Sequence, residues 1–201
     1  MTTFGPIKEY KFFTIDECDK IKEYAYRKED ELTKEGHLQG EFDSITTNNY
    51  FRYNFLRDHP IYAARFVDFL RQTQDNIEWP IAVQSWVNIY RRGDGIFWHN
   101  HIGNMGNSFA ANIFIDGPTK PGTVYLTESG YEINEVTSEN KRGYIQIFPT
   151  AILHKVNPVQ SERISVGITL HFGRNTVDHV LKQFNDANEG LIILREDGMI
   201  V

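Results

Sequence analysis

The sequence predicts a mainly β protein with flanking helices, an α+β arrangement in which helices cover one face of an antiparallel sandwich or barrel. Apolar residues recur at helical spacing before residue 80, and the period changes to two from residue 81 onward. The β-type segments are short and are separated by Gly, Pro and Asn. From the length of 201 residues we expect a single domain (1–201), with a helical N-terminal part (10–80), a β core (81–173) and a C-terminal helix and strand tail (174–201).

The composition excludes several classes of protein. Hydrophobic residues make up 40% of the chain, and the net charge of −6 comes without the Lys- or Arg-rich run that nucleic-acid binding would need. The single cysteine, Cys18, excludes an intramolecular disulfide and fits a reducing compartment. Because the N-terminus has no apolar leader and no run of 18 apolar residues occurs, we expect a cytoplasmic protein without a membrane segment.

Two helices are predicted in the N-terminal part. Thr14 followed three residues later by Glu17 is a capping box, and apolar residues at helical spacing follow it. Pro60 marks the start of the second helix. Between the two helices, residues 33–58 are polar and rich in Asn and Thr, which predicts a loop with a short strand near Tyr50–Phe55.

The β core is predicted from short segments in which polar and apolar residues alternate. These segments are IAVQSWVNIY, SFAANIFID, GTVYLTE, YEINEV, GYIQIFP, HKVNP and RISVGITLHF. After Gly173, a helix is expected in TVDHVLKQFNDANEG and a strand in LIILREDGMIV. This tail could pack on the body of the chain or on a second subunit, as in a homodimer, and its sequence leaves both arrangements open.

Two histidines one residue apart mark the first candidate site. His99 and His101 follow a Gly-containing turn, and on a strand residues i and i+2 point to the same side, so both imidazoles can face one point. A third candidate is His154, where the chain enters another strand. An H-x-H pair also occurs as two polar residues at the mouth of a loop, so the spacing alone leaves the metal and surface interpretations open.

The last β segment of the core carries polar residues on one face. In RISVGITLHF the alternation separates Arg163, Ser165, Gly167, Thr169 and His171 from five apolar residues. Arg163 and Ser165 are therefore neighbours on the polar face, which is unusual for a plain core strand. A guanidinium and a hydroxyl together bind a carboxylate well, so this pair is a candidate anion site.

Further polar side chains lie on strands that we expect to line the same cavity. Asn88 and Tyr90 share one face of the first β segment, while Asn112 and Tyr125 lie within apolar segments. Each can line the cavity, or it can pack with its polar group satisfied elsewhere. His171 lies about 27 Å along an extended strand from the arginine, at about 3.3 Å per residue, and we expect a satisfied core or rim histidine there.

Taken in order, these residues resemble the Fe(II)- and 2-oxoglutarate-dependent dioxygenases, most closely the prolyl-hydroxylase-like members and a related group known mainly from bacteria and phages. That family carries a Tyr and a Gly before H-x-D, a later G…FP…H segment, and an Arg or Lys about ten residues after that His. The N-terminal FFTIDECDKIKEYA also fits, and the likeness spans roughly residues 10–172. The matching residues are Tyr90, Gly93, His99, His101, Gly143, Phe148, Pro149, His154, Arg163 and Ser165.

The resemblance implies a double-stranded β-helix, or jelly roll, over residues 81–173, with the N-terminal helices packed on one sheet. The implied activity is that of a hydroxylase that uses Fe(II), 2-oxoglutarate and O2 and releases succinate and CO2, with ascorbate as a candidate reductant. Its substrate, peptidyl or prolyl or a small metabolite, is not identified. The implied contacts are His99, His101 and His154 for the metal, and Arg163, Ser165, Tyr90, Asn88 and Asn112 for 2-oxoglutarate.

One position departs from the family pattern, because His101 stands where the family has an aspartate. His101 can ligate the metal in a three-histidine site, or it can stand aside and leave the position to water or a halide. Alternatively, a carboxylate such as Glu128 or Asp116 can replace it from another strand. We favour ligation, because a neutral imidazole at i+2 reaches the metal without rearrangement of the backbone. The missing anionic ligand leaves the site one unit more positive, which favours dianionic 2-oxoglutarate.

Two other functions compete with an oxygenase. A non-catalytic jelly roll with a degenerate metal site, either ligand-binding or structural, is supported by the missing carboxylate. A cupin-like three-histidine metalloenzyme that does not use 2-oxoglutarate is disfavoured by the presence of Arg163 and Ser165.

Overall fold

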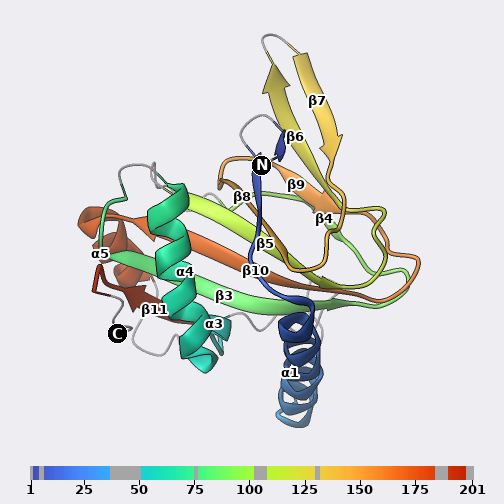
Figure 1. The fold of residues 1–201 in the computed structure, drawn as a ribbon, viewed down its shortest axis with the longest axis horizontal. Helices are drawn as coiled ribbons and strands as arrows, with labels where there is room; N and C mark the ends of the chain where they lie inside the picture. The colour runs from blue at the N-terminus through green and yellow to red at the C-terminus, as the bar shows by residue number, and fades with distance from the viewer. Residues whose placement is uncertain are drawn as a thin grey trace.

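The fold is built on two antiparallel sheets (Figure 1), seen in a computed structural model that describes residues 2–4, 7–36, 51–74, 77–101, 108–129, 132–183 and 190–197. The large sheet contains β1 (Thr2–Phe4), β2 (Ile7–Lys11), β3 (Ile81–Tyr90), β5 (Ser108–Asp116), β8 (Tyr144–Pro149), β10 (Arg163–Phe172) and β11 (Leu191–Leu194). The small sheet contains β4 (Ile96–His99), β6 (Thr123–Ser129), β7 (Glu132–Thr137) and β9 (His154–Val156). Their orders are β1-β2-β8-β5-β10-β3-β11 and β4-β9-β6-β7. The predicted mainly β fold with flanking helices is confirmed.

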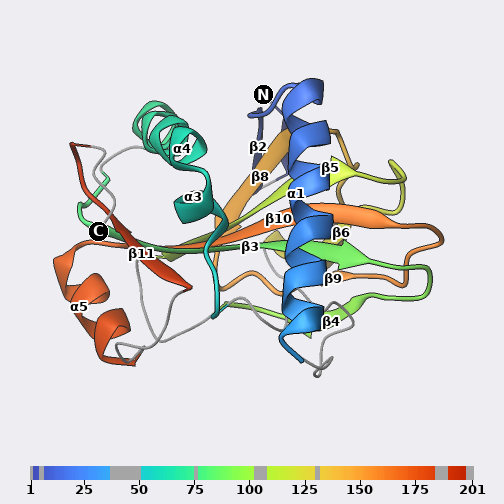
Figure 2. The ribbon, with the colours of Figure 1, turned by 90° about the horizontal axis from the view of Figure 1, so that it is seen from below.

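The N-terminal helices begin where the sequence predicts. In α1 (Ile15–Lys34) the predicted capping box is present, with the Glu17 amide donating to Thr14 Oγ1 at 3.2 Å and the Thr14 amide donating to Glu17 Oε2 at 2.9 Å. A short α3 (Phe55–Asp58) precedes α4 (Pro60–Thr73), which has proline in its first turn. In Figure 1, α1 lies below the large sheet and the small sheet lies above it, and the view from below in Figure 2 places α1 in front of the strands.

The two faces of the large sheet differ in chemistry. Because residues directly opposite in antiparallel strands point to the same side, the register of β10 with β3 and β5 assigns every side chain to a face. Ile164, Val166 and Ile168 face the helices and form the main hydrophobic core with the buried side chains of α1 and α4. The alternate residues, from Arg163 to His171, face the small sheet and are nevertheless buried. The main core therefore lies between helices and sheet, and the space between the two sheets carries the polar groups.

The prediction of a short strand near Tyr50–Phe55 is wrong for its described residues 51–55, which form no strand and instead cover the edge of β3. Asn54 caps α3, and its Nδ2 donates to the carbonyl of Val83 at 2.9 Å. The amide of Val87 donates to the Tyr53 hydroxyl at 2.9 Å. These side chains satisfy backbone groups of β3 that would otherwise form an open sheet edge.

Both ends of the chain extend the large sheet. The N-terminal strand β2 was not predicted, and it pairs with β8 through Lys8–Lys11. The C-terminal tail forms α5 (Arg174–Gln183) and β11, and β11 pairs with the start of β3. Part of the tail thus packs on the body of the same chain, and the homodimer stays a prediction. Within the described ranges, no helix is long and apolar enough to cross a membrane.

Candidate metal centre

Three histidines converge between the two sheets. His99 ends β4 and lies directly opposite His154, the first residue of β9. His101 lies two residues beyond β4, and its amide donates to the carbonyl of Thr150 at 3.1 Å. One ring nitrogen from each of the three lies within 4.8 Å of the others. The predicted convergence of His99 and His101 is observed, although His101 reaches the site from outside the strand on which it was expected.

Backbone carbonyls orient two of the rings. His99 Nδ1 lies 2.8 Å from the carbonyl oxygen of Phe97, and His154 Nδ1 lies 3.0 Å from that of Ile152. A carbonyl only accepts, so each Nδ1 carries the hydrogen and each Nε2 keeps its lone pair. His101 Nε2 lies 3.3 Å from His154 Nε2. The ring nitrogens that can bind a metal therefore point at one another, with the orientation that metal-binding histidines receive from hydrogen bonds at the other nitrogen.

Burial keeps these imidazoles neutral. Burial, together with a smaller effect of neighbouring His99, lowers the pKa of His154 to about 3. Burial also lowers the pKa of His99, and it holds the pKa of His101 well below the ordinary value. Three neutral imidazoles offer nitrogen ligands that suit a divalent transition metal. The residues present therefore fit an ion such as Fe(II).

The alternative ligand Asp116 does not reach the histidines. It forms ion pairs with Lys22 of α1 and, at 3.7 Å, with Arg142. Its place opposite Ile164 also puts it on the helix-facing side of the large sheet. The side chain of Glu128, the other candidate, lies outside the described part of the chain. Among the described side chains, the cluster around His101 contains no carboxylate.

Arg163 is a buried cation on the facing sheet. Its side chain is 1% exposed, its Nη2 donates to Thr123 Oγ1 at 3.0 Å, and its guanidinium lies 5.4 Å from the ring centroid of Tyr90. Its Nε has no hydrogen-bond partner among the described residues, and no described carboxylate pairs with it. Burial accordingly lowers the pKa of Arg163. A desolvated guanidinium with unused donors is complementary to an anionic ligand.

The other predicted contacts lie on the same inner face. Tyr90 is opposite Arg163 and Asn88 is opposite Ser165, with Asn88 Nδ2 at 3.5 Å from Ser165 Oγ. Asn112 is on β5, on the other side of β10 from Tyr90 and Asn88. It is half-buried and lies opposite the middle of β10. The first four residues are thus brought together, while Asn112 lies further along the face.

A buried polar chain beside the arginine was largely missed by sequence reasoning. Tyr125 donates to Gln146 Oε1 at 2.8 Å, Gln146 Nε2 donates to Glu9 Oε2 at 3.1 Å, and Lys141 pairs with Glu9 Oε1 at 2.6 Å. Tyr125 was a candidate cavity residue, and Thr123 at i−2 on the same face of β6 could have been found from that alternation. Glu9 had no such signal, because its strand meets β8 only in the folded chain.

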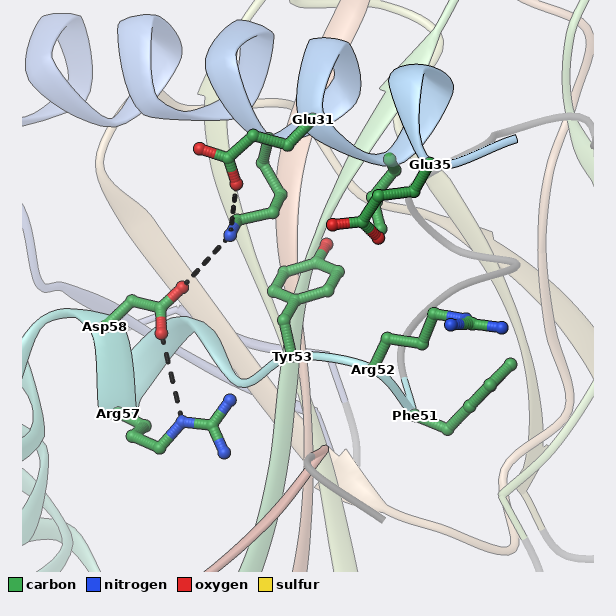
Figure 3. A pocket seen from close by; sticks show the side chains of 9 residues that line it. Glu31, Glu35, Phe51, Arg52, Tyr53, Arg57 and Asp58 are labelled. Carbon is green, nitrogen blue, oxygen red and sulfur yellow. Dashed lines mark hydrogen bonds and ion pairs between the residues drawn. The ribbon is translucent and has the colours of Figure 1, made fainter. Parts of the chain in front are cut away.

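A separate pocket of about 480 Å³ lies between α1 and the segment 51–58 (Figure 3). It is on the helix side of the large sheet, away from the histidines. Three of its charged side chains pair with one another: Lys28 contacts Glu31 at 2.7 Å and Asp58 at 3.6 Å. Because these charges are already neutralised, we assign no ligand to this pocket.

Comparison with known proteins identifies the fold. No family model matches the chain, and no curated protein is significantly similar to it in sequence. Among solved structures, a Pseudomonas putida prolyl-4-hydroxylase aligns with a TM-score of 0.56 and 14% identity over 85% of this chain and 94% of its own. The non-heme alpha-ketoglutarate-dependent carbocyclase SnoK from nogalamycin biosynthesis gives 0.56 and 13%, over 84% and 80%. HygX from Streptomyces hygroscopicus, solved with nickel and 2-oxoglutarate, gives 0.55 and 8%, over 83% and 82%. The chain therefore has the jelly-roll fold shared by prolyl-4-hydroxylase, SnoK and HygX.

Proposed function

We propose that this chain is a non-haem Fe(II)- and 2-oxoglutarate-dependent oxygenase. One observation carries the proposal. Arg163 is buried without an anionic partner among the described residues, and it faces the same space between the two sheets as three converging neutral imidazoles. A jelly roll that only binds other proteins has no use for a desolvated guanidinium or for neutral imidazoles whose ring nitrogens converge. The shared fold with HygX, which binds nickel and 2-oxoglutarate, supports the same assignment.

Each side chain then has a defined task. His99, His101 and His154 would hold Fe(II) through the ring nitrogens that face one another, and Arg163 with Ser165 would bind the far carboxylate of 2-oxoglutarate. Tyr90 and Asn88 flank that carboxylate position, and Asn112 lies further along. Fe(II), 2-oxoglutarate and O2 together supply the oxidant for hydroxylation, with succinate and CO2 as the other products. Three neutral ligands leave the metal charge uncompensated, which favours binding of a dianion.

The substrate and the fate of the missing carboxylate remain predictions. Prolyl-4-hydroxylase and the carbocyclase SnoK share this fold, so the fold does not distinguish a prolyl or peptidyl substrate from a small metabolite. The competing function is a non-catalytic ligand-binding module, favoured by the absence of a carboxylate among the described residues around His101.

Anaerobic titration with Fe(II), with and without 2-oxoglutarate, tests the proposal. We expect a visible charge-transfer band that requires both components, and succinate once air is admitted. His99→Ala and His154→Ala should lose metal by elemental analysis, whereas Arg163→Ala should keep metal and lose the band at low 2-oxoglutarate. His179→Ala, at an exposed position on α5, is the matched control. Metal binding without the band or any succinate would favour the non-catalytic module, and full metal content in His99→Ala would remove the proposed centre.

A further inference from the structure

We infer that Gln84, Thr169 and His171 form a second binding surface on the inner face of the large sheet, and that it receives a neutral amide group of the substrate. This inference rests on the proposed function and names the substrate class of the same site.

The surface lies on the opposite side of the metal centre from Arg163. Gly167 is the middle inner-facing residue of β10, and a Cβ added there would come within 2.8 Å of the ring of Trp86 on β3. That ring is 6.1 Å from the His101 ring, measured between centroids. Trp86 and His101 therefore divide the inner face. The arginine lies about 13 Å along the strand to one side, and His171 lies about 13 Å to the other, at about 3.3 Å per residue.

One side-chain and two backbone hydrogen bonds join this surface to the metal centre. His171 Nδ1 lies 2.9 Å from Ser108 Oγ. The carbonyl of Ser108 accepts from the amide of Thr150 at 3.2 Å, and the carbonyl of Thr150 accepts from the amide of His101 at 3.1 Å. Thr169 lies directly opposite Gln84 on the neighbouring strand. The three side chains are thus held next to the centre by rigid sheet pairing.

The surface has unused hydrogen-bonding capacity. Gln84, Thr169 and His171 are 5%, 4% and 6% exposed, respectively. Gln84 Nε2 is buried without a hydrogen-bond partner in the described part of the chain. Thr169, whose hydroxyl can both donate and accept, lies directly opposite it. Burying an unpaired polar group lowers stability, and an apolar side chain would fill the same space without that cost. A ligand that supplies both a donor and an acceptor accounts for polar residues at these positions.

The three side chains themselves carry no charge, in contrast to the arginine end of the same face. Burial lowers the pKa of His171 to about 4, so its ring is neutral at neutral pH. On the far side, Ala82 packs against Val177 and Val180 of α5 in an apolar cluster. A carboxylate or an ammonium bound here would lose its hydration without gaining a counter-ion. An amide, whose oxygen accepts from Gln84 and whose N–H donates to a hydroxyl, is uncharged and satisfies both sides.

The test is an NMR titration of the full chain without added metal, observing the ring C–H signals of His171 with three probes of similar size: propionamide, propionate and propylammonium. We expect saturable shifts with propionamide alone. Gln84→Leu and Thr169→Val should each raise its dissociation constant at least tenfold. Gln74→Leu, which removes another amide on the helix side of the sheet, should leave it unchanged, and thermal unfolding checks that each variant folds.

The inference is overturned if propionate shifts the same signals as strongly as propionamide, if no probe gives a saturable shift, or if both inner-face variants bind the amide like the wild type. Because no metal is added, this result is separate from the Fe(II) titration. Amide binding without the charge-transfer band would remove the proposed oxygenase and keep the amide-binding surface. A charge-transfer band without amide binding would keep the oxygenase and remove the surface.

Discussion

Replacing Arg163 by methionine should change stability and cosubstrate binding in opposite directions. An unpaired buried ion costs several kcal/mol of desolvation. Against this, the bond from Arg163 to Thr123 at 3.0 Å contributes about 1.5–3 kcal/mol, and the contact with the Tyr90 ring contributes about 1–2 kcal/mol. These contributions nearly cancel, so we expect the free energy of unfolding of the metal-free protein to rise by about 1 kcal/mol. If the buried cation were paired with a carboxylate, its truncation would instead lower the free energy of unfolding by about 3–5 kcal/mol.

Binding of 2-oxoglutarate should weaken strongly in the same variant. Truncating one partner of a buried, hydrogen-bonded charge pair costs about 2–5 kcal/mol. A loss of about 3 kcal/mol corresponds to a roughly 100-fold higher dissociation constant, at about 1.4 kcal/mol per tenfold change. The affinity for Fe(II) should stay within a few-fold, because Arg163 is not part of the histidine cluster.

Two assays follow these quantities: urea unfolding of the metal-free protein, and anaerobic titration of 2-oxoglutarate against the Fe(II)-loaded protein. Arg163→Lys is the matched control, since it keeps the charge but not the planar fork. The assignment of Arg163 as an unpaired cation that binds 2-oxoglutarate is refuted if Arg163→Met lowers the free energy of unfolding by more than about 2 kcal/mol, as the loss of a buried pair with a carboxylate would. It is also refuted if the variant binds 2-oxoglutarate like the wild type.

Three further predictions concern other parts of the chain. If His101 is a ligand, His101→Asp keeps Fe(II) binding and His101→Ala weakens it by roughly ten- to hundredfold or more, and an unchanged dissociation constant in the alanine variant would exclude the three-histidine site. Tyr125→Phe leaves the buried Gln146 oxygen without its donor at 2.8 Å, so we expect the free energy of unfolding to fall by about 1–2 kcal/mol, with unchanged metal content. Arg65 lowers the pKa of Glu17 from 4.5 to about 2, so the stability this pair contributes is present above pH 4.5 and is lost as the pH falls toward 2. Because the Arg65 side chain is 40% exposed, we expect about 0.5–1 kcal/mol between wild type and Glu17→Gln at pH 6 and almost none at pH 2, by urea unfolding.

Local patterns carried much of the fold and of the candidate site. The capping box at Thr14 and Glu17 needs only four consecutive residues, and it is present. The alternation along Arg163–Phe172 assigned the polar and apolar sides of the strand correctly, because a pleated backbone turns successive side chains to opposite faces wherever the strand lies. The same rule explains why Arg163 and Ser165 could be placed together before any contact was known.

Features that depend on long-range pairing could not be obtained in this way. The segment near Tyr53 has the residue pattern of a strand, yet it caps the edge of β3 with side-chain hydrogen bonds. His101 meets the other histidines through the carbonyl of Thr150, not through strand geometry. Both outcomes depend on which segments become neighbours, and local propensity does not encode that choice.

Glu9 shows the division most clearly. The alternation of side chains along β2 could place Glu9 on either face of the sheet, but nothing near it in the chain indicates a buried partner. Gln146, which donates to it at 3.1 Å, lies 137 residues away. The residue pattern thus sets which chemistry each strand presents to a face, and the pairing of β2 with β8 and of β4 with β9 sets which of those groups meet. The physical reason is that side-chain direction follows from local backbone geometry, whereas strand pairing follows from burial and hydrogen bonding summed over the whole chain.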